Sequence, residues 1–270
     1  MPELAEVYFH SQQWNPGLGR VVRAVVTHPQ TRIFREVPAE DLESKLRGQR
    51  LERSECHGKK MCFVASGNRR LGIHLGMTGE LVAHVPGKDL GDSSAKKYEH
   101  LALHMDNGWI LGFRDYRQFG RVWWSEGPED PDWWKDLPPQ PQEEAFTREH
   151  FEGLLAKRPR TPLKGLLLEQ DKFPGVGNWM ADEILWRARL RPRRTPAELG
   201  PVLRRRLYEE LVYVSRWALR HIGRTYEDPP ESWLFPHRWR DGGACPQTGR
   251  PLRRETISGR TSCWSPSWQR

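Results

Sequence analysis

A proline-rich acidic break divides this chain into two stretches of different character. The break runs PEDPDWWKDLPPQPQ over residues 128–142, and its composition favours neither helix nor strand. Ahead of it, short apolar or alternating runs are bounded by turn residues, as in RVVRAVVTH, RLGIHLGMTGEL, HLALHMDNGWILGF and GRVWW. Behind it, apolar residues recur at helical spacing, as in NWMADEILWRARL. The sequence therefore predicts an α+β chain with a β-rich part first and a helical part second.

The charge of the chain favours an anionic partner. There are 43 Lys and Arg against 35 Asp and Glu, a formal net charge of +8, and many of the basic residues follow the break. A generally basic surface would give the same count. No run of about 18 apolar residues occurs, so we expect no membrane span. The N-terminus lacks the apolar core of a secretory signal, which predicts a cytoplasmic protein, nucleoid-associated if bacterial.

The first residues, Met1-Pro2-Glu3, could expose a reactive amine. A small penultimate residue favours removal of Met1, which would leave Pro2 as a free secondary amine. An α-amino group has an ordinary pKa of about 7.7–8.0, so a substantial fraction is neutral at pH 7. Such an amine can attack an aldehyde-like carbon and form an iminium, with Glu3 beside it as an acid or base. Many chains begin with Met-Pro, so this pattern alone is not specific.

Two segments behind the break could bind phosphate. In FPGVGN, residues 173–178, a helix is expected to end and another to begin near Asn178, where backbone N–H groups suit an anion. An ordinary helix hairpin explains this segment equally well. In the tail, Arg253, Arg254 and Arg260 flank a predicted β-hairpin turn at 258–259 that could reach a nucleic-acid backbone.

Six segments taken together resemble the formamidopyrimidine-DNA glycosylase/endonuclease VIII (Fpg/Nei) family over essentially the whole chain. They are MPELAEV, GKK at 58–60, IHLGMTGEL at 73–81, DYRQFGR at 115–121, LKGLLLEQ…FPGVGNWMADEILWRARLRP at 163–192 and GRTS at 259–262. The resemblance implies a β-sandwich catalytic domain over 1–126, an acidic linker over 127–144, a helix–two-turn–helix DNA-binding domain over 145–225 and an antiparallel β-hairpin finger over 226–270.

The resemblance also implies roles for individual residues. Pro2 matches the nucleophile, Glu3 the acid that helps to open the deoxyribose ring, and Lys59 a lysine that contacts phosphate and assists catalysis. The expected DNA-binding residues are His74, Lys164, Asn178 and Arg260. The side chains expected to fill the space left by an everted nucleotide are Met77, Arg117 and Phe119. Two of these, Met77 and Phe119, could instead be core residues, and Lys59 could be an exposed strand lysine.

The finger departs from the family pattern of two Cys-x2-Cys pairs. Cys245 occupies the first ligand position, but the other three positions hold Thr248, Ser265 and Trp268. Cys263 lies two residues before its expected place, which leaves too few soft ligands for a tetrahedral site. We therefore expect no zinc and no other cofactor. The finger should be a zincless variant held by packing of its tryptophans, which are Trp239, Trp264 and Trp268.

The implied function is that of a bifunctional DNA glycosylase and AP lyase of base-excision repair. It would act as a monomer on double-stranded DNA that contains oxidised bases or abasic sites. It would remove formamidopyrimidines, 8-oxoguanine or oxidised pyrimidines and nick the strand by β,δ-elimination through a Pro2 iminium. A compact stretch at 223–243 argues against a preference for 8-oxoguanine, whereas Leu4 is more typical of enzymes that have it. The alternatives are a catalytically silent binder of damaged DNA or structured nucleic acid on the same scaffold, and an RNA-associated basic protein.

Overall fold

The structure, a computed structural model, describes residues 1–28, 30–86 and 95–270. It divides into two compact units. The first consists of Met1–Pro2 and Glu6–Leu137, and the second of Glu3–Ala5 and Pro138–Arg270. Helix α1 (Leu4–Gln12) therefore begins in one unit and continues in the other.

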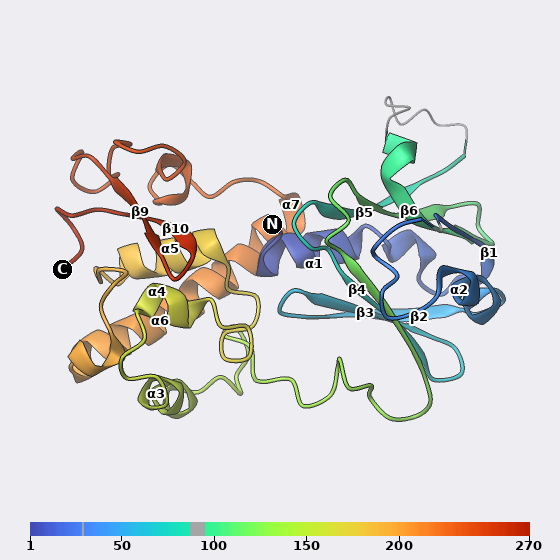
Figure 1. Ribbon diagram of the computed structural model, residues 1–270, viewed down its shortest axis with the longest axis horizontal. Helices are drawn as coiled ribbons and strands as arrows, with labels where there is room; N and C mark the ends of the chain where they lie inside the picture. The colour runs from blue at the N-terminus through green and yellow to red at the C-terminus, as the bar shows by residue number, and fades with distance from the viewer. Residues whose placement is uncertain (29, 87–94) are drawn as a thin grey trace. The chain divides into compact units, whose positions relative to one another are not determined.

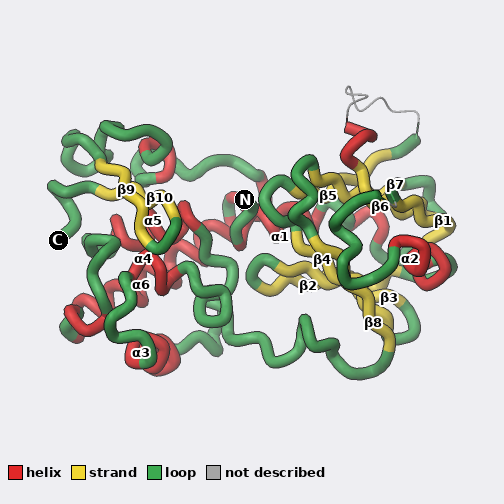
Figure 2. The backbone as a smooth tube through the Cα atoms, in the orientation of Figure 1, coloured by secondary structure: helices red, strands yellow, loops and turns green. Residues whose placement is uncertain are grey.

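Two four-stranded antiparallel sheets form the first unit (Figures 1 and 2). One sheet has the order β1-β6-β7-β5 and the other the order β2-β3-β4-β8. The strands are β1 (Val22–Thr27), β2 (Leu51–His57), β3 (Lys60–Ala65), β4 (Arg69–His74), β5 (Gly79–His84), β6 (Glu99–Met105), β7 (Ile110–Asp115) and β8 (Arg121–Glu126). A short helix, α2 (Ala39–Leu46), follows β1. This arrangement confirms the predicted N-terminal β-sandwich.

A shared apolar core explains why these segments become strands. Side chains from both sheets meet in one buried cluster, to which Phe63 of β3 and Phe113 of β7 contribute. Trp14 is fully buried there; its ring lies 4.6 Å from that of Phe63, and its Nε1 donates to the carbonyl of Gly112 at 3.2 Å. A turn at residues 106–108 lies between β6 and β7.

Residues 127–134, the first part of the acidic break, pack against the sheet that contains β4. Arg70 donates to the carbonyls of Gly127 and Glu129 at 3.0 and 3.1 Å and pairs with Asp130 at 3.0 Å. Trp133 stacks on Trp123 of β8, with ring centroids 5.7 Å apart. These contacts fix the path of the chain as it leaves β8.

The second unit is helical ahead of its C-terminal hairpin. Its helices are α3 (Arg148–Ala156), α4 (Leu163–Leu167), α5 (Asn178–Arg187), α6 (Pro201–Arg220) and α7 (Ile222–Thr225). Helix α5 begins at Asn178, as predicted, and residues 179–186 along it are all buried. Helix α4 ends at Leu167, earlier than the helix end predicted near Phe173. The chain turns instead, because the amide of Gln170 binds the carbonyl of Val176 at 2.8 Å and the amide N–H of Gly175 at 3.2 Å.

The predicted C-terminal hairpin is present. Strands β9 (Arg253–Ile257) and β10 (Arg260–Trp264) are antiparallel, and Ser258 and Gly259 join them with φ angles of 49° and 74°. Two residues with positive φ make the tight turn whose twist matches paired strands. No helix in the described part of the chain has the length and apolar character needed to cross a membrane.

Candidate functional site

The carboxylate of Glu3 lies at the N-terminal end of α5. Its two oxygens accept hydrogen bonds from the backbone N–H groups of Trp179 (2.9 Å) and Met180 (3.1 Å). A helix start presents unpaired N–H groups and partial positive charge, so a carboxylate is a suitable partner there. Gly177 is required before the helix, because a Cβ at this position would collide with the Glu3 side chain. The GVGN motif therefore positions Glu3, and Pro2 precedes it directly in the chain.

Lys59 and His74 lie in the same region of the β-sandwich. Lys59 is at the turn of the β2–β3 hairpin and is only 9% exposed, so it is not an exposed strand lysine. His74 ends β4, and its Nδ1 accepts a hydrogen bond from the N–H of Gly76 at 3.0 Å. Burial, with smaller contributions from the charges of Lys59, Arg121 and Lys60, lowers the pKa of His74 to about 4. In the free protein His74 is therefore a neutral group near a catalytic candidate.

The three side chains predicted to fill the space left by an everted nucleotide lie on two neighbouring exposed loops. Met77 and Phe119 are 37% and 45% exposed, so neither is a core residue. The Arg117 guanidinium lies over the Phe119 ring at 4.9 Å. The structure thus brings Arg117 and Phe119 together on the β7–β8 loop and places Met77 on the β4–β5 loop.

A buried carboxylate, that of Asp115, fastens these two loops to each other. Its Oδ1 accepts from the hydroxyl of Thr78 at 2.7 Å and from the N–H of Arg117 at 3.2 Å. Its Oδ2 accepts from the N–H of Gly120 at 2.7 Å. Because Thr78 follows Met77 and Gly120 follows Phe119, Asp115 fixes the loop backbone beside both exposed apolar side chains.

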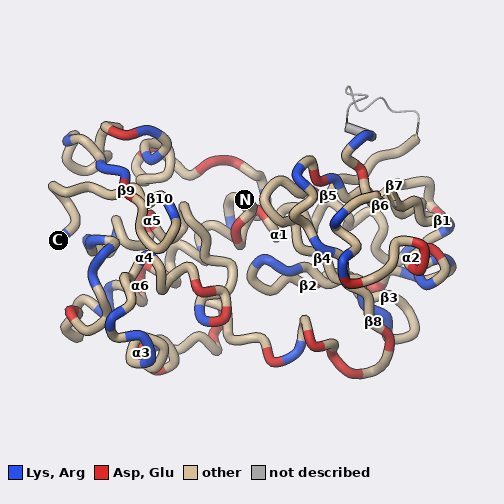
Figure 3. The backbone as a smooth tube through the Cα atoms, in the orientation of Figure 1, with Lys and Arg blue, Asp and Glu red and all other residues tan. Residues whose placement is uncertain are grey.

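The predicted phosphate-binding residues Asn178 and Arg260 belong to the second unit. Asn178 opens α5, and its Oδ1 is buried without a hydrogen-bond partner within the described residues. Arg260 opens β10 and is exposed. Figure 3 shows Lys and Arg along β9, at the start of β10 and on the chain around α4 and α6. The elements that carry Asn178 and Arg260 therefore belong to a unit rich in Lys and Arg.

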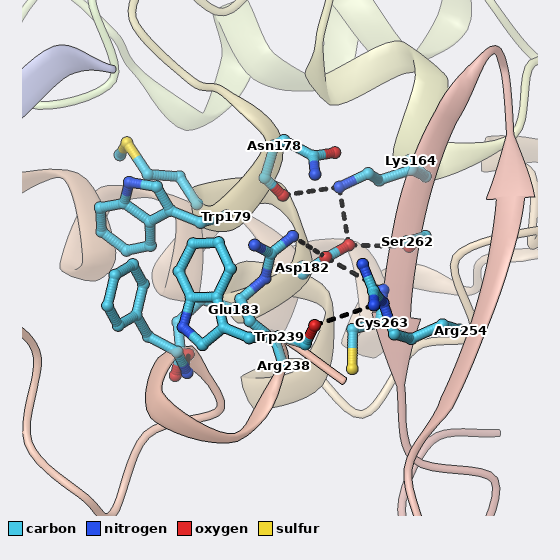
Figure 4. Close-up of polar contacts among 12 residues, drawn as sticks. Lys164, Asn178, Trp179, Asp182, Glu183, Arg238, Trp239, Arg254, Ser262 and Cys263 are labelled. Atoms are coloured by element: carbon cyan, nitrogen blue, oxygen red, sulfur yellow. Dashed lines mark hydrogen bonds and ion pairs between the residues drawn. The ribbon is translucent and has the colours of Figure 1, made fainter. Parts of the chain in front are cut away.

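Lys164 is in the interior of the second unit. Its side chain is fully buried, and its Nζ donates to Asp182 Oδ1 at 2.6 Å and to the carbonyl of Asn178 at 2.7 Å (Figure 4). Burial lowers the pKa of Lys164, which the charge of Asp182 opposes. A direct contact between Lys164 and DNA, as predicted, would require this side chain to leave its buried position.

The carboxylate of Asp182 is the centre of a buried hydrogen-bond network that the sequence analysis did not identify. Besides Lys164, its carboxylate accepts hydrogen bonds from Arg238 Nη2 at 2.6 Å, Ser262 Oγ at 2.7 Å and the N–H of Cys263 at 3.0 Å. An acidic residue inside the apolar run NWMADEILW was the available signal, since a buried carboxylate must be paired. Its neighbour Glu183 is also buried, and burial raises the pKa of Glu183 to about 8.

In the finger, polar side chains surround Cys245, the residue at the first of the four expected zinc-ligand positions. Burial would raise the pKa of the Cys245 thiol, but hydrogen bonds from the Ser265 and Thr248 hydroxyls lower it. Thr248 and Ser265 each also contact the hydroxyl of Ser267, at 2.8 and 3.1 Å. Over residues 1–28, 30–86 and 95–270, no group of three or more His, Cys, Asp or Glu side chains could hold a metal ion.

The tryptophans predicted to hold the finger do not act alike. Trp264 is 8% exposed, and Trp268 packs against the buried cluster that contains Cys245. The Arg189 guanidinium lies 3.7 Å from the centre of the Trp268 ring. Trp239, in contrast, is 57% exposed, so the prediction that it packs inside the finger is wrong. Its ring contacts that of Phe235, with centroids 5.2 Å apart and the two rings nearly perpendicular.

Comparisons with known proteins match almost the full chain. Residues 1–122 match the model of the formamidopyrimidine-DNA glycosylase N-terminal domain, and residues 137–228 match that of the formamidopyrimidine-DNA glycosylase H2TH domain. Formamidopyrimidine-DNA glycosylases from Solibacter usitatus and Desulforamulus reducens are 34% and 31% identical to this chain. The alignments cover all of this chain and 100% and 99% of those proteins.

Solved structures agree with these matches. The crystal structure of the MutM (Fpg) protein from Thermus thermophilus is 31% identical with a TM-score of 0.79, over 99% of this chain and 98% of that one. A structure of MutM in complex with DNA containing carbocyclic 8-oxo-G is 22% identical with a TM-score of 0.86, over the whole of both chains. The second likeness concerns the fold alone.

The role of Asp115 gives a first prediction. Replacing Asp115 by Asn leaves one acceptor oxygen where two accept now, so an NH2 group faces the N–H of either Gly120 or Arg117, and that donor loses its acceptor. We expect Asp115→Asn to lower the free energy of unfolding by about 2 kcal/mol, measured by urea denaturation. Asp106→Asn, at an exposed turn, is the control and should change it by less than about 0.5 kcal/mol. Equal effects of the two substitutions would contradict this role.

A second prediction concerns the titration of His74. Its folded pKa of about 4 lies below the ordinary value of 6.5. As pH falls from 6.5 to 4, the unfolded chain gains this proton and the folded chain does not, so the contribution of His74 to stability is lost over that range. The NMR signals of the His74 ring, assigned with His74→Gln, should stay constant from pH 8 to near pH 5. A titration midpoint close to 6.5 would contradict the prediction.

Proposed function

Because this chain belongs to the formamidopyrimidine-DNA glycosylase family of DNA glycosylases and AP lyases in base-excision repair, we propose that Pro2, Glu3 and Lys59 carry out its two reactions. The observation that carries this assignment is the place of Glu3. Its carboxylate is fixed by two backbone N–H groups of α5, and it directly follows the residue whose amine would react. A reacting group gains most when its neighbours are held in place before the substrate arrives.

In the first reaction, the Pro2 nitrogen attacks C1′ of the damaged nucleotide. The bond between C1′ and the base breaks, and the base leaves with the electron pair and takes up a proton. Pro2 loses its N–H proton in the same exchange. A neutral secondary amine suits this step, because only a nitrogen with a free electron pair can form the new bond.

In the second reaction, the sugar ring opens and the strand is cut. The C1′–O4′ bond breaks as Glu3, which has taken up the N–H proton of Pro2, donates that proton to O4′, and the nitrogen lone pair forms the C1′=N iminium. The iminium acidifies the proton on C2′, so its loss expels the 3′ phosphate, and a further elimination expels the 5′ phosphate. Water then hydrolyses the remaining iminium and restores Pro2. Every step uses groups of this chain and water.

The proposed substrate is double-stranded DNA containing an oxidised base or an abasic site, bound by one copy of the chain. Lys59 and neutral His74 would bind phosphate near the lesion, and Asn178 and Arg260 the phosphates beside it. Met77, Arg117 and Phe119 would fill the position of the flipped nucleotide and so offset part of the unstacking cost, a few kcal/mol. Their exposure on loops fixed by Asp115 supports this role.

The iminium gives the decisive test. Borohydride reduction during incubation with duplex DNA containing an abasic site should yield a covalent adduct between protein and DNA, seen as a shifted band on a denaturing gel. Pro2→Gly should lose at least about 90% of the adduct, because the secondary amine is gone. Retention of Met1 should have the same effect. Lys45→Ala, on the α2 surface, is the control and should form as much adduct as the unchanged protein.

The outcomes separate this proposal from a silent damage-binding protein. Binding to abasic DNA without any trapped adduct would favour the silent binder and overturn the proposal. When an adduct does form, the preferred lesion is identified by comparing the rates of base release from duplexes that carry formamidopyrimidine, 8-oxoguanine or an oxidised pyrimidine.

We also propose that the finger folds without zinc. The Thr248 and Ser265 hydroxyls support this proposal, because both form hydrogen bonds with the Cys245 thiol and with the hydroxyl of Ser267 at positions where the family has thiolates. Elemental analysis of the purified protein should find far less than one zinc per chain, and EDTA should leave adduct formation unchanged. Cys245→Ser replaces the buried thiol by a smaller group that can still bond to the Ser265 and Thr248 hydroxyls, and it should leave the melting temperature within about 3 °C. Stoichiometric zinc that EDTA removes with loss of activity would overturn the proposal.

A further inference from the structure

A single buried carboxylate connects the start of α5 to the finger hairpin. Asp182 has no exposed side-chain surface, and it receives hydrogen bonds from three separate segments (Figure 4). Lys164 comes from α4, Arg238 from the loop that precedes the hairpin, and Ser262 from β10. The backbone N–H of Cys263 adds a fourth bond. Such a carboxylate joins helix, loop and strand through one group.

The periodicity of α5 and of β10 relates Asp182 and its partner Ser262 to the two proposed phosphate-binding residues, Asn178 and Arg260. Residues four apart lie on the same face of a helix, so Asp182 lies one turn below Asn178. Residues two apart lie on the same face of a strand, so Ser262 and Arg260 leave β10 on the same side. Lys164 adds a direct link, because its Nζ binds both Asp182 and the carbonyl of Asn178.

The tip of the hairpin also contacts α4. A Cβ on Gly165, the residue after Lys164, would collide with the Oγ of Ser258 in the hairpin turn. The turn therefore packs directly on the helix that carries Lys164. This contact is independent of the hydrogen bonds at Asp182 and restrains the same end of the hairpin, next to Arg260.

We propose that Asp182 is a positioning residue that holds Asn178 and Arg260 at a fixed separation, so that both can bind phosphates on the same DNA strand. Lys164 acts through Asp182 and Asn178 and contributes no contact of its own with DNA. The proposal rests on the proposed function, because that function makes Asn178 and Arg260 the phosphate-binding residues.

The test uses the full chain and a duplex carrying a tetrahydrofuran abasic analogue, which the enzyme cannot cleave. Binding is measured at several salt concentrations for the unchanged protein and for Arg260→Ala, Ser262→Ala and the double variant. Ser262→Ala removes one buried hydrogen bond to Asp182 and leaves both ion pairs, so the fold should persist. Ser215→Ala is the matched control, because Ser215 is equally buried in α6 and its Oγ has no partner among the described residues.

We expect Arg260→Ala to reduce the slope of log K against log salt by about 0.9, the loss of one phosphate contact. Ser262→Ala should weaken binding about fivefold and reduce the slope in the same direction. In the protein that already lacks Arg260, Ser262→Ala should have less than about a twofold effect, because the group that it positions is absent. Ser215→Ala should leave the binding constant and the slope unchanged.

Asp182→Asn removes the charge at the centre of this network and should weaken DNA binding more than Ser262→Ala does. Circular dichroism should confirm that the variant is folded. Its matched control is Glu183→Gln, the next residue along the same buried helix, and this control should bind DNA as the unchanged protein does.

A merely structural role predicts a different pattern. Ser262→Ala would then lower the melting temperature but leave the salt slope intact, or weaken binding by the same factor with and without Arg260. Either result would overturn the inference and leave the proposed function standing. Failure of the unchanged protein to prefer the abasic duplex over an undamaged one would overturn the proposed function, and this inference with it.

Discussion

A charge removed from water must be paired, and three buried carboxylates meet that condition in ways that determine this structure. Glu3 accepts hydrogen bonds from the N–H groups at the start of α5, and Asp115 accepts them from donors in two loops. Asp182 accepts them from two cationic side chains and from donors on β10 of the finger. Each accepts hydrogen bonds from segments that are distant in sequence. Because an unpaired buried charge is costly, moving any of these segments away from its carboxylate carries a large cost in free energy.

The outline of the fold could be predicted because it depends on local sequence pattern. Alternation, turn residues and helical spacing marked most strands and helices, and the start of α5 followed from FPGVGN. Strands β2 and β3 escaped this reasoning, and LERSECH of β2 is only partly buried and lacks clear alternation. Met77 and Phe119 had no internal signal that separated exposure from burial, so their placement came from the family resemblance and then from the structure.

The partners of the buried acids could not be predicted, because a sequence shows the charge of a residue but not which distant group it meets. Lys164 illustrates the difficulty. A lysine in a basic domain suggests a phosphate contact, yet its partner Asp182 lies 18 residues away and the second cation, Arg238, lies 56 residues beyond that. Trp239 shows the converse, since an aromatic residue expected inside the finger lies largely exposed.

The bond between Glu3 and α5 has a consequence for how the chain is made. Glu3 and Trp179 are 176 residues apart, so the partner of Glu3 does not yet exist when the N-terminus emerges from the ribosome. At ordinary rates of synthesis the delay is roughly 9 to 35 s. For that time the first residues cannot dock, and an aminopeptidase has access to Met1. The order of synthesis therefore gives the chain an interval in which its N-terminal amine can be uncovered before folding encloses the residue next to it.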